Sequence, residues 1–498
     1  MSLLVKAESI SLLAALESAL GVQPTSGWKT LQPNADGVGD FYPKLKTVAP
    51  SPLSKFRQME RPEIVDLDAT PKITHDWSKD LQDQFAEGIF LAHAKHTGGT
   101  GLSYFLPTAR TTTDYTVPAL GALQANTLVY ARGFVNAANN GLFVVGASST
   151  GTAVKVASGV AETVSGYVAT LEVAGWRGAS GDIAMDASGN ITSTVADFTT
   201  MGIPVGIMIW VGGTAGGSNA FATAAYRGYA KVTAVTATKL TLARRQWTVA
   251  AADTGSGKLI DLYWGRWFRN VAFDDADYQE PSYALELGLP GVGTAGATEY
   301  VYAAGCMVSS IDITSPAQNI VTAGVMFLGT TIGDPGTSRA TGASTAAGLL
   351  AIDRYTSVSK LKYLRVVNQA TEAIVSNDIA TWKLTFNNNI TPQKQQGLLG
   401  TARDVVGKAQ VDMDIEAFLT QDEGWKACSA NTSLAFGAGF RNADGGTFFD
   451  VPSLVFTDAP PKFPGNGPVS LSVKSAGFRD ATGNYTLGMS TFAFLPNG

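Results

Sequence analysis

Apolar and polar residues alternate along several stretches in the last quarter of the chain. Across residues 382–386, tryptophan, leucine and phenylalanine are separated by lysine and threonine, and the same period of two recurs over residues 469–474. Successive side chains of a strand point to opposite faces, so this period predicts strands with one buried face. Residues 485–494 are expected to form a further strand. Turn residues between such runs favour antiparallel pairing.

One stretch has helical spacing instead. Over residues 76–94, apolar residues recur every three or four positions, which places them on one side of a helix. Asp76 is the expected N-cap, and Gly98-Gly99 should end the helix. Shorter helices are expected at residues 7–20 and 418–429. The pattern as a whole predicts a mainly β protein with one principal helix.

Composition divides the chain into three parts. Residues 1–75 contain scattered prolines and little periodicity, which predicts an extended N-terminal arm that needs a partner surface. Residues 76–114 and 263–498 are predicted to form one β core, flanked by the helix at 76–94. Residues 115–262 are richer in alanine, glycine, threonine and valine, and are expected to form an inserted small β module.

Charged residues make up only 15% of the 498 residues, against roughly 25% in an average soluble protein. Such a composition suits a β-rich subunit whose surface is covered by neighbouring copies. A net charge of −5 gives no sign of a basic surface for gripping phosphates. The sequence contains no uninterrupted run of about 18 apolar residues, so it predicts no membrane span. Glu8 and Glu17 interrupt the N-terminal apolar stretch, which argues against a secretory signal.

Few residues are arranged for catalysis or metal binding. Cys306 and Cys428 stand far apart in sequence and are expected to be small buried residues. The three histidines, His75, His93 and His96, do not form the H-E-x-x-H pattern. No nucleophile elbow or complete phosphate-binding loop is present either. The sequence therefore predicts no enzyme, no cofactor and no metal.

The most informative polar pattern lies at residues 411–418, where apolar residues alternate with three carboxylates. In a strand, Asp412, Asp414 and Glu416 would share one face, about 7 Å apart from one to the next. That spacing is wide for chelating one ion, although a metal site stays one hypothesis. A solvated strand face is the second. The third is the acidic lining of a ring of subunits, which would repel DNA.

Arginines and tryptophans also alternate in the middle of the chain. They could form a nucleic-acid patch, but aspartates surround them, so stacking of arginine on tryptophan at an interface is favoured. The residues concerned are Arg244, Arg245, Trp247, Trp264, Arg266, Trp267 and Arg269.

A series of segments, taken in order, carries a family resemblance. These are residues 28–34, 51–53, 81–94, 263–271, 281–286, 300–315, 384–390, 399–408, 411–425, 448–456 and 464–468. Their order and spacing resemble the tail tube proteins of long-tailed bacteriophages, the major tail protein family. The likeness covers roughly residues 20–105 and 263–495, and it leaves the module at 115–262 unassigned.

The resemblance implies an antiparallel β-sandwich or barrel-like core that closes into homohexameric rings, which stack into a tube. It implies as partners further copies of the chain, a tape measure protein, and tail tip and tail terminator proteins, while DNA crosses the lumen during ejection without specific binding. The protein would be assembled in the host cytoplasm and reside in the virion tail. Because the lumen should have no room for the module, it should face outward, which favours a non-contractile, siphovirus-like tail.

Two other functions compete with this hypothesis. One is a β-rich surface protein that binds carbohydrate through the module, with Trp210, Tyr226 and Tyr229 stacking on sugars. The other is a glycosidase that uses Asp412 with Asp414 or Glu416, although no acid/base setting is recognisable around them.

Overall fold

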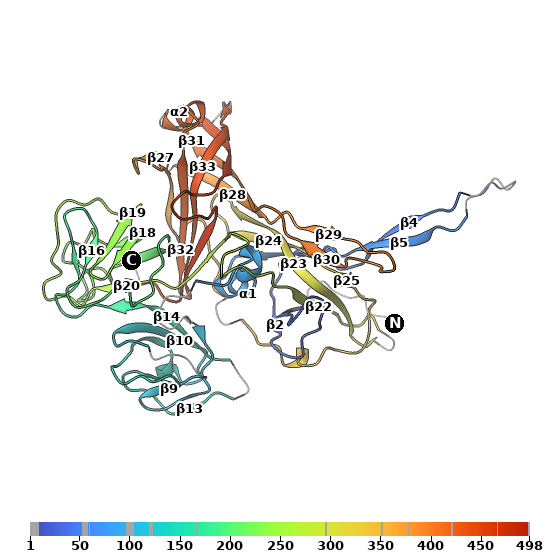
Figure 1. Ribbon diagram of the computed structural model, residues 1–498, viewed down its shortest axis with the longest axis horizontal. Helices are drawn as coiled ribbons and strands as arrows, with labels where there is room; N and C mark the ends of the chain where they lie inside the picture. The colour runs from blue at the N-terminus through green and yellow to red at the C-terminus, as the bar shows by residue number, and fades with distance from the viewer. Residues whose placement is uncertain are drawn as a thin grey trace.

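The computed structural model shows a mainly β molecule with a central sandwich, a β-rich lobe beside it and a hairpin that projects from the body (Figure 1). The prediction of an antiparallel β-sandwich is confirmed, and the described strands form open sheets that do not close on themselves. No helix within the described part of the chain is long and apolar enough to cross a membrane. The structure describes residues 9–51, 58, 60–95, 104–118, 123–165, 168–293, 296–349, 352–376, 378–419, 422–465 and 467–496.

The first sheet of the sandwich has the strand order β6–β24–β23–β28–β31–β35, with every pairing antiparallel. Along these strands one set of side chains is buried and the alternate set is not, as the period of two predicts. Their bounds are β6 (Lys72–Asp76), β24 (Thr322–Leu328), β23 (Glu299–Ser315), β28 (Ile379–Asn387), β31 (Gln410–Phe418) and β35 (Ser470–Gly477).

The second sheet, which β33 joins to the first through its pairing with β35, is buried on both faces at its central strands β32, β33 and β36. Its β33 contains ten consecutive buried residues, from 445 to 454. Phe449 points toward the first sheet, where it lies 6.4 Å from Trp382 between ring centroids, whereas Phe448 points the other way and packs against Tyr229 of the lobe. The strands are β21 (Arg266–Arg269), β36 (Gly488–Phe492), β33 (Gly445–Asp458), β32 (Leu434–Asn442), β26 (Leu361–Asn368) and β27 (Ile374–Ser376).

The N-terminal helix expected at residues 7–20 is absent from its described part, which contains strand β1 (Ser11–Leu16) instead. This strand pairs with β22 (Tyr283–Leu289) along its whole length. Four successive residues, 12–15, are buried because β1 is covered on both sides. An apolar run without period two or 3.6 fits either structure, and tertiary pairing decides for the strand.

The principal helix is shorter than predicted. Helix α1 spans Lys79–Phe90 with Ser78 as N-cap, because Asp76 is the last residue of β6 and pairs with β24. Leu91 ends the helix in the left-handed conformation, with φ 49°; Gly98-Gly99 lie outside the described residues. The expected second helix is α2 (Glu423–Ser429), since the first residue of the predicted range, Phe418, belongs to β31.

The arm carries a hairpin of β4 (Lys44–Val48) and β5 (Glu63–Asp68), which extends away from the body (Figure 1). Leu45, Val48 and Ile64 are each about half exposed on it. The remaining short strands of the core are β2 (Lys29–Thr30), β3 (Val38–Gly39), β25 (Thr331–Ile332), β29 (Thr391–Gln393), β30 (Arg403–Val405) and β34 (Pro461–Lys462).

The lobe contains its own ten-stranded and four-stranded sheets. Its strands begin at residue 104, so residues 104–114, which were expected in the core, pair with strands of the module instead. They are β7 (Tyr104–Phe105), β8 (Ala109–Arg110), β9 (Asp114–Thr116), β10 (Thr127–Arg132), β11 (Gly141–Val144), β12 (Ala153–Lys155), β13 (Glu162–Thr163), β14 (Thr170–Arg177), β15 (Ala184–Met185), β16 (Ile191–Thr192), β17 (Met208–Val211), β18 (Gly228–Thr236), β19 (Lys239–Ala243) and β20 (Asp261–Tyr263).

Two buried ionic clusters fix the lobe to the core. In the first, Glu172 of β14 accepts hydrogen bonds from Lys79 of α1 at 3.0 Å and from Arg132 of β10 at 2.8 Å. In the second, Asp450 of β33 pairs with Arg244 and, at 3.0 Å, with Lys231. Because a buried charge without a partner is costly, these pairs hold the lobe in one position.

We predict that Glu172→Gln lowers the free energy of unfolding by about 3–5 kcal/mol, because two buried cations lose their shared carboxylate. Burial alone would raise the pKa of Glu172, but Lys79 and Arg132 outweigh it and hold this pKa well below its ordinary value. The stabilisation should therefore be complete above pH about 4.5 and decline as the pH falls. Urea unfolding at pH 7 and pH 3 measures both effects. Glu63→Gln, an exposed change, is the control; equal loss in both variants would contradict the prediction.

One buried carboxyl lacks a partner. Both oxygens of Asp404, in β30, are buried and accept no hydrogen bond from the described residues. Burial, opposed by the charge of Lys394 and aided by that of Glu280, raises the pKa of Asp404 to about 6. A raised pKa means that the folded state favours the neutral acid, so stability falls as the pH rises from about 4 through 6.

Asp404→Asn should therefore raise the free energy of unfolding by about 1–3 kcal/mol at pH 8 and leave it nearly unchanged at pH 4. Denaturant unfolding of both proteins at these two pH values tests this, with the exposed change Asp36→Asn as control. A loss of stability at pH 8 would show that this carboxylate has a stabilising partner.

Candidate functional site

The outer face of the first sheet carries mostly polar side chains. We call it the polar face. The predicted acidic strand is β31, and Asp412, Asp414 and Glu416 all lie on this face while the apolar residues between them are buried. The register of the strands gives its members: Lys72, Thr74, Asp76, Ser310, Asp312, Thr314, Thr322, Gly324, Met326, Thr381, Lys383, Thr385, Asn387, Gln410, Asp412, Asp414, Glu416, Ser472, Lys474 and Ala476.

Lysines on the neighbouring strands flank the acidic row of β31. Lys383 of β28 and Lys474 of β35 stand opposite Asp414 on either side. Lys462 of β34 lies 3.5 Å from Glu416. The polar face itself, without Lys462, contains five carboxylates and three lysines, which gives a net charge of −2. The lysines are Lys72, Lys383 and Lys474. Mixed charge of this kind gives a weak field and strong hydration.

The carboxylates of this face contact neighbouring side chains. Asp412 accepts a hydrogen bond from Gln410 at 2.6 Å, and Asp312 accepts one from Thr385 at 2.7 Å. Asp312 also pairs with Lys383 at 3.3 Å. Over the described ranges, no three His, Cys, Asp or Glu residues come close enough together to hold a metal ion. The arrangement suits a hydrated surface that a large solute can pass.

The aromatic residues proposed for sugar binding are interior. Trp210, Tyr226 and Tyr229 are 5%, 2% and 0% exposed. Tyr229 lies 5.0 Å from Phe448, between ring centroids, in the junction of lobe and core. The carbohydrate hypothesis for these three residues is therefore wrong, because Trp210 and Tyr229 are buried between lobe and core and Tyr226 is buried beside Phe221 of the lobe.

Three of the arginines in the arginine and tryptophan pattern contact other residues of the protein itself. The guanidinium of Arg269 lies 4.9 Å from the ring centre of Trp267, which is buried, and Arg244 belongs to the Asp450 cluster. Arg266 pairs with Asp83 of α1. The predicted stacking of arginine on tryptophan is confirmed for the first pair.

Among the described residues, the cysteines and histidines do not come together in a metal-binding group. Cys306 is buried, and burial raises the pKa of its thiol, whereas Cys428 is partly exposed. His75 is also buried on β6, and burial lowers its pKa to about 4. His93 is exposed, 3.6 Å from Glu87; His96 lies outside the described residues.

Sequence reasoning missed the residues that join the lobe to the core. Glu172 and Asp450 are each one carboxylate inside an apolar strand, in Thr170–Arg177 and Gly445–Asp458. Such an isolated charge is the signal that could have found them, because a carboxylate in a buried strand requires a buried cation.

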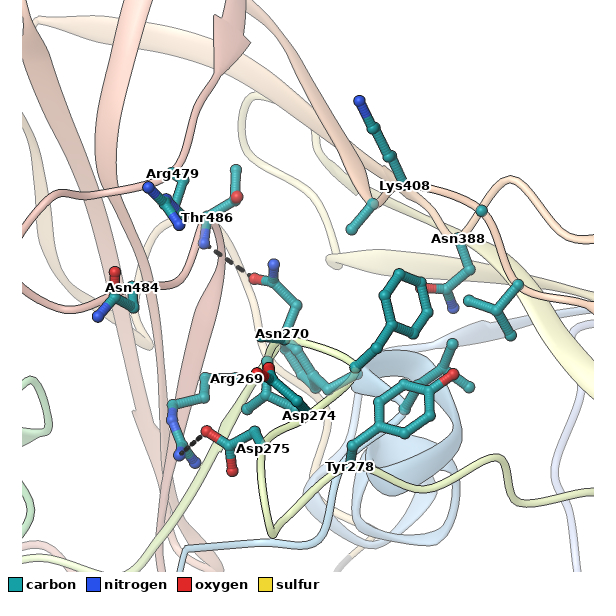
Figure 2. A pocket seen from close by; sticks show the side chains of 18 of the residues that line it. Arg269, Asn270, Asp274, Asp275, Tyr278, Asn388, Lys408, Arg479, Asn484 and Thr486 are labelled. Atoms are coloured by element: carbon teal, nitrogen blue, oxygen red, sulfur yellow. Dashed lines mark hydrogen bonds and ion pairs between the residues drawn. The ribbon is translucent and has the colours of Figure 1, made fainter.

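A cavity of about 700 Å³ opens at one rim of the polar face, where α1 ends and β31 begins (Figure 2). Its apolar part includes Phe90, Val271 and Tyr278, and its charged part includes Lys408 and Arg479. Figure 2 shows Asn270 held by the backbone of Thr486 and Arg269 directed toward Asp275, so the wall of this cavity is fixed by its own hydrogen bonds and ion pairs.

A family model described as phage tail tube protein matches residues 177–486, which is more than half of the chain. The match includes residues 177–262. The second part of the lobe, which was expected to be an insertion, therefore lies within the region that the family model covers. No curated protein matches the chain. The chain belongs to the phage tail tube protein family and is a structural component of a phage tail.

Proposed function

We propose that six copies of this chain close into a ring, that the rings stack into a tail tube, and that the polar face lines its channel. The observation that carries this proposal is a six-stranded sheet with one continuous apolar side and one continuous hydrophilic side. A channel wall needs a firm backing and a wetted inner surface.

The charges of the polar face fit the passage of DNA without binding. Lysines alternate with carboxylates and carboxylates are in excess, so phosphates meet weak net repulsion. Affinity for DNA depends on neutralising several phosphates at once. The polar face offers three lysines for this, and two of them, Lys383 and Lys474, stand opposite Asp414. DNA would therefore slide through the lumen during ejection without sequence-specific contacts.

The lobe would face the outside of the tube. It covers the second sheet on the side away from the polar face, where Phe448 and Asp450 contact it. A lumen lined by the polar face leaves the lobe at the greatest radius. A closely fitting contractile sheath would have to surround six such lobes per ring, so we propose a non-contractile, siphovirus-like tail.

The arm and the hairpin of β4 and β5 would bridge to neighbouring copies, because their exposed apolar residues have no cover within the described chain. A tape measure protein in the lumen and tail tip and tail terminator proteins at the ends complete the proposed set of partners. Assembly in the host cytoplasm agrees with two cysteines that remain free thiols.

The purified full chain should form hollow tubes or six-fold rings in negative-stain electron microscopy. To identify the inner face, Thr385→Cys and Val195→Cys would each be made in a Cys428→Ser background and labelled with a maleimide gold cluster before assembly. Thr385 lies on the polar face and Val195 is 72% exposed on the lobe. We expect gold along the tube axis for the first variant and along the outer wall for the second.

Gold outside the tube for Thr385→Cys would overturn the assignment of the polar face while leaving the tube intact. Compact monomers at every concentration, with and without a tail tip complex as initiator, would overturn the tube itself.

A further inference from the structure

The two ends of strand β31 carry unlike surfaces. At its C-terminal end, Phe418, Trp425 and Phe463 are 44%, 52% and 75% exposed. Strand pairing places Phe418 opposite Ser470 and Ser470 opposite Lys462, which precedes Phe463. Helix α2 packs at the same end of β31, where Gly424, the residue before Trp425, lines a small cavity together with Phe418. We call these three residues the aromatic tip; helix α2, which carries Trp425, lies at the upper end of the sandwich in Figure 1.

The N-terminal end of β31 carries the cavity shown in Figure 2, about 30 Å away along nine residues of strand. Residues 406–409, which precede β31, form part of its wall. Phe273 stands at its mouth, 62% exposed, with its ring 5.3 Å from that of Tyr278. An exposed aromatic pair beside an apolar pocket offers edge-to-face contact to a further aromatic ring.

Cations are in slight excess at the cavity, whose lining contains Arg269, Lys408 and Arg479 against Asp274 and Asp275. Lys408 and Arg479 are exposed at the cavity and form no ion pair with any described residue. One nitrogen of Arg269 is buried there without a hydrogen-bond partner. At the aromatic tip, Asp422 precedes α2 and pairs with Lys426, and Glu423 is the first residue of the helix.

We propose that the aromatic tip of one copy inserts into this cavity of another copy, with Trp425 as the anchor and Glu423 beside Lys408. The contact is head-to-tail: the two surfaces belong to the same chain but face opposite ways along the strand direction, so one molecule cannot satisfy both. It rests on the proposed function, because stacked rings bring one end of each polar face against the opposite end of the next. It adds the specific surfaces that join one ring to another.

The direct test is a photo-cross-link in the full chain. Trp425 is replaced by the photoreactive residue p-benzoylphenylalanine, the protein is irradiated at assembling concentration, and cross-linked peptides are identified by mass spectrometry. We expect intermolecular links to residues 269–278 or 406–409. The same replacement at Val135, 80% exposed on the lobe, is the control and should give no link to these segments.

Charge reversal provides an independent measurement. Glu423→Lys and Lys408→Glu should each raise the concentration for half-maximal assembly about tenfold or more, and the double variant should restore it. Trp425→Ala should have at least as large an effect, since aromatic anchors dominate interfaces. Circular dichroism would verify that each variant is folded.

The outcomes separate this contact from the tube itself. Tubes that form normally from Trp425→Ala, or links from position 425 only to other surfaces, would overturn the contact and leave the proposed tube standing. Single rings that no longer stack would support both. A wild-type chain that gives neither tubes nor intermolecular links would overturn both.

Discussion

The centre of the second sheet, where strand β33 is buried on both faces, is the constraint on which the rest of the molecule depends. Its strand β33 sends Phe449 into the sandwich and Phe448 into the lobe, so the strand is interior in both directions. Gly437 and Gly439 on the neighbouring strand let the lobe approach closely: a Cβ at Gly439 would come within 2.9 Å of Tyr229. The polar face, the inner sheet and the lobe are therefore three layers of one folding unit.

The buried charges determine how these layers are positioned. Removing the ionic clusters of Glu172 and Asp450 in favour of apolar residues need not weaken the protein, since buried ion pairs repay their desolvation only in part. These pairs determine the relative position of lobe and core. A carboxylate within an apolar interface is tolerated only when the two layers are placed so that its cations lie beside it. The interface of lobe and core is thereby limited to one register.

The sequence predicted the first sheet well because its strands have one wet and one dry side. Alternation over residues 382–386 and 411–418 gave both the strand and the direction of its side chains. It failed where both sides are dry. Residues 12–15 lack any period, so strand β1 was predicted as a helix, and the lobe boundary was drawn at 115 although pairing begins at 104. The lysines beside the acidic row belong to other strands, and only the register of the sheet places them opposite Asp414.

A three-layered subunit of this kind is a stiff element. Its layers share side chains and ion pairs, so shear between them would break buried contacts, whereas the hairpin and the ends of β31 would meet other molecules through exposed residues. Any tube built from such blocks would bend like a chain of rigid links, with the strain concentrated at the joints. The curvature that a tail can tolerate would then be set by the compliance of its joints, while its bore keeps a constant cross-section.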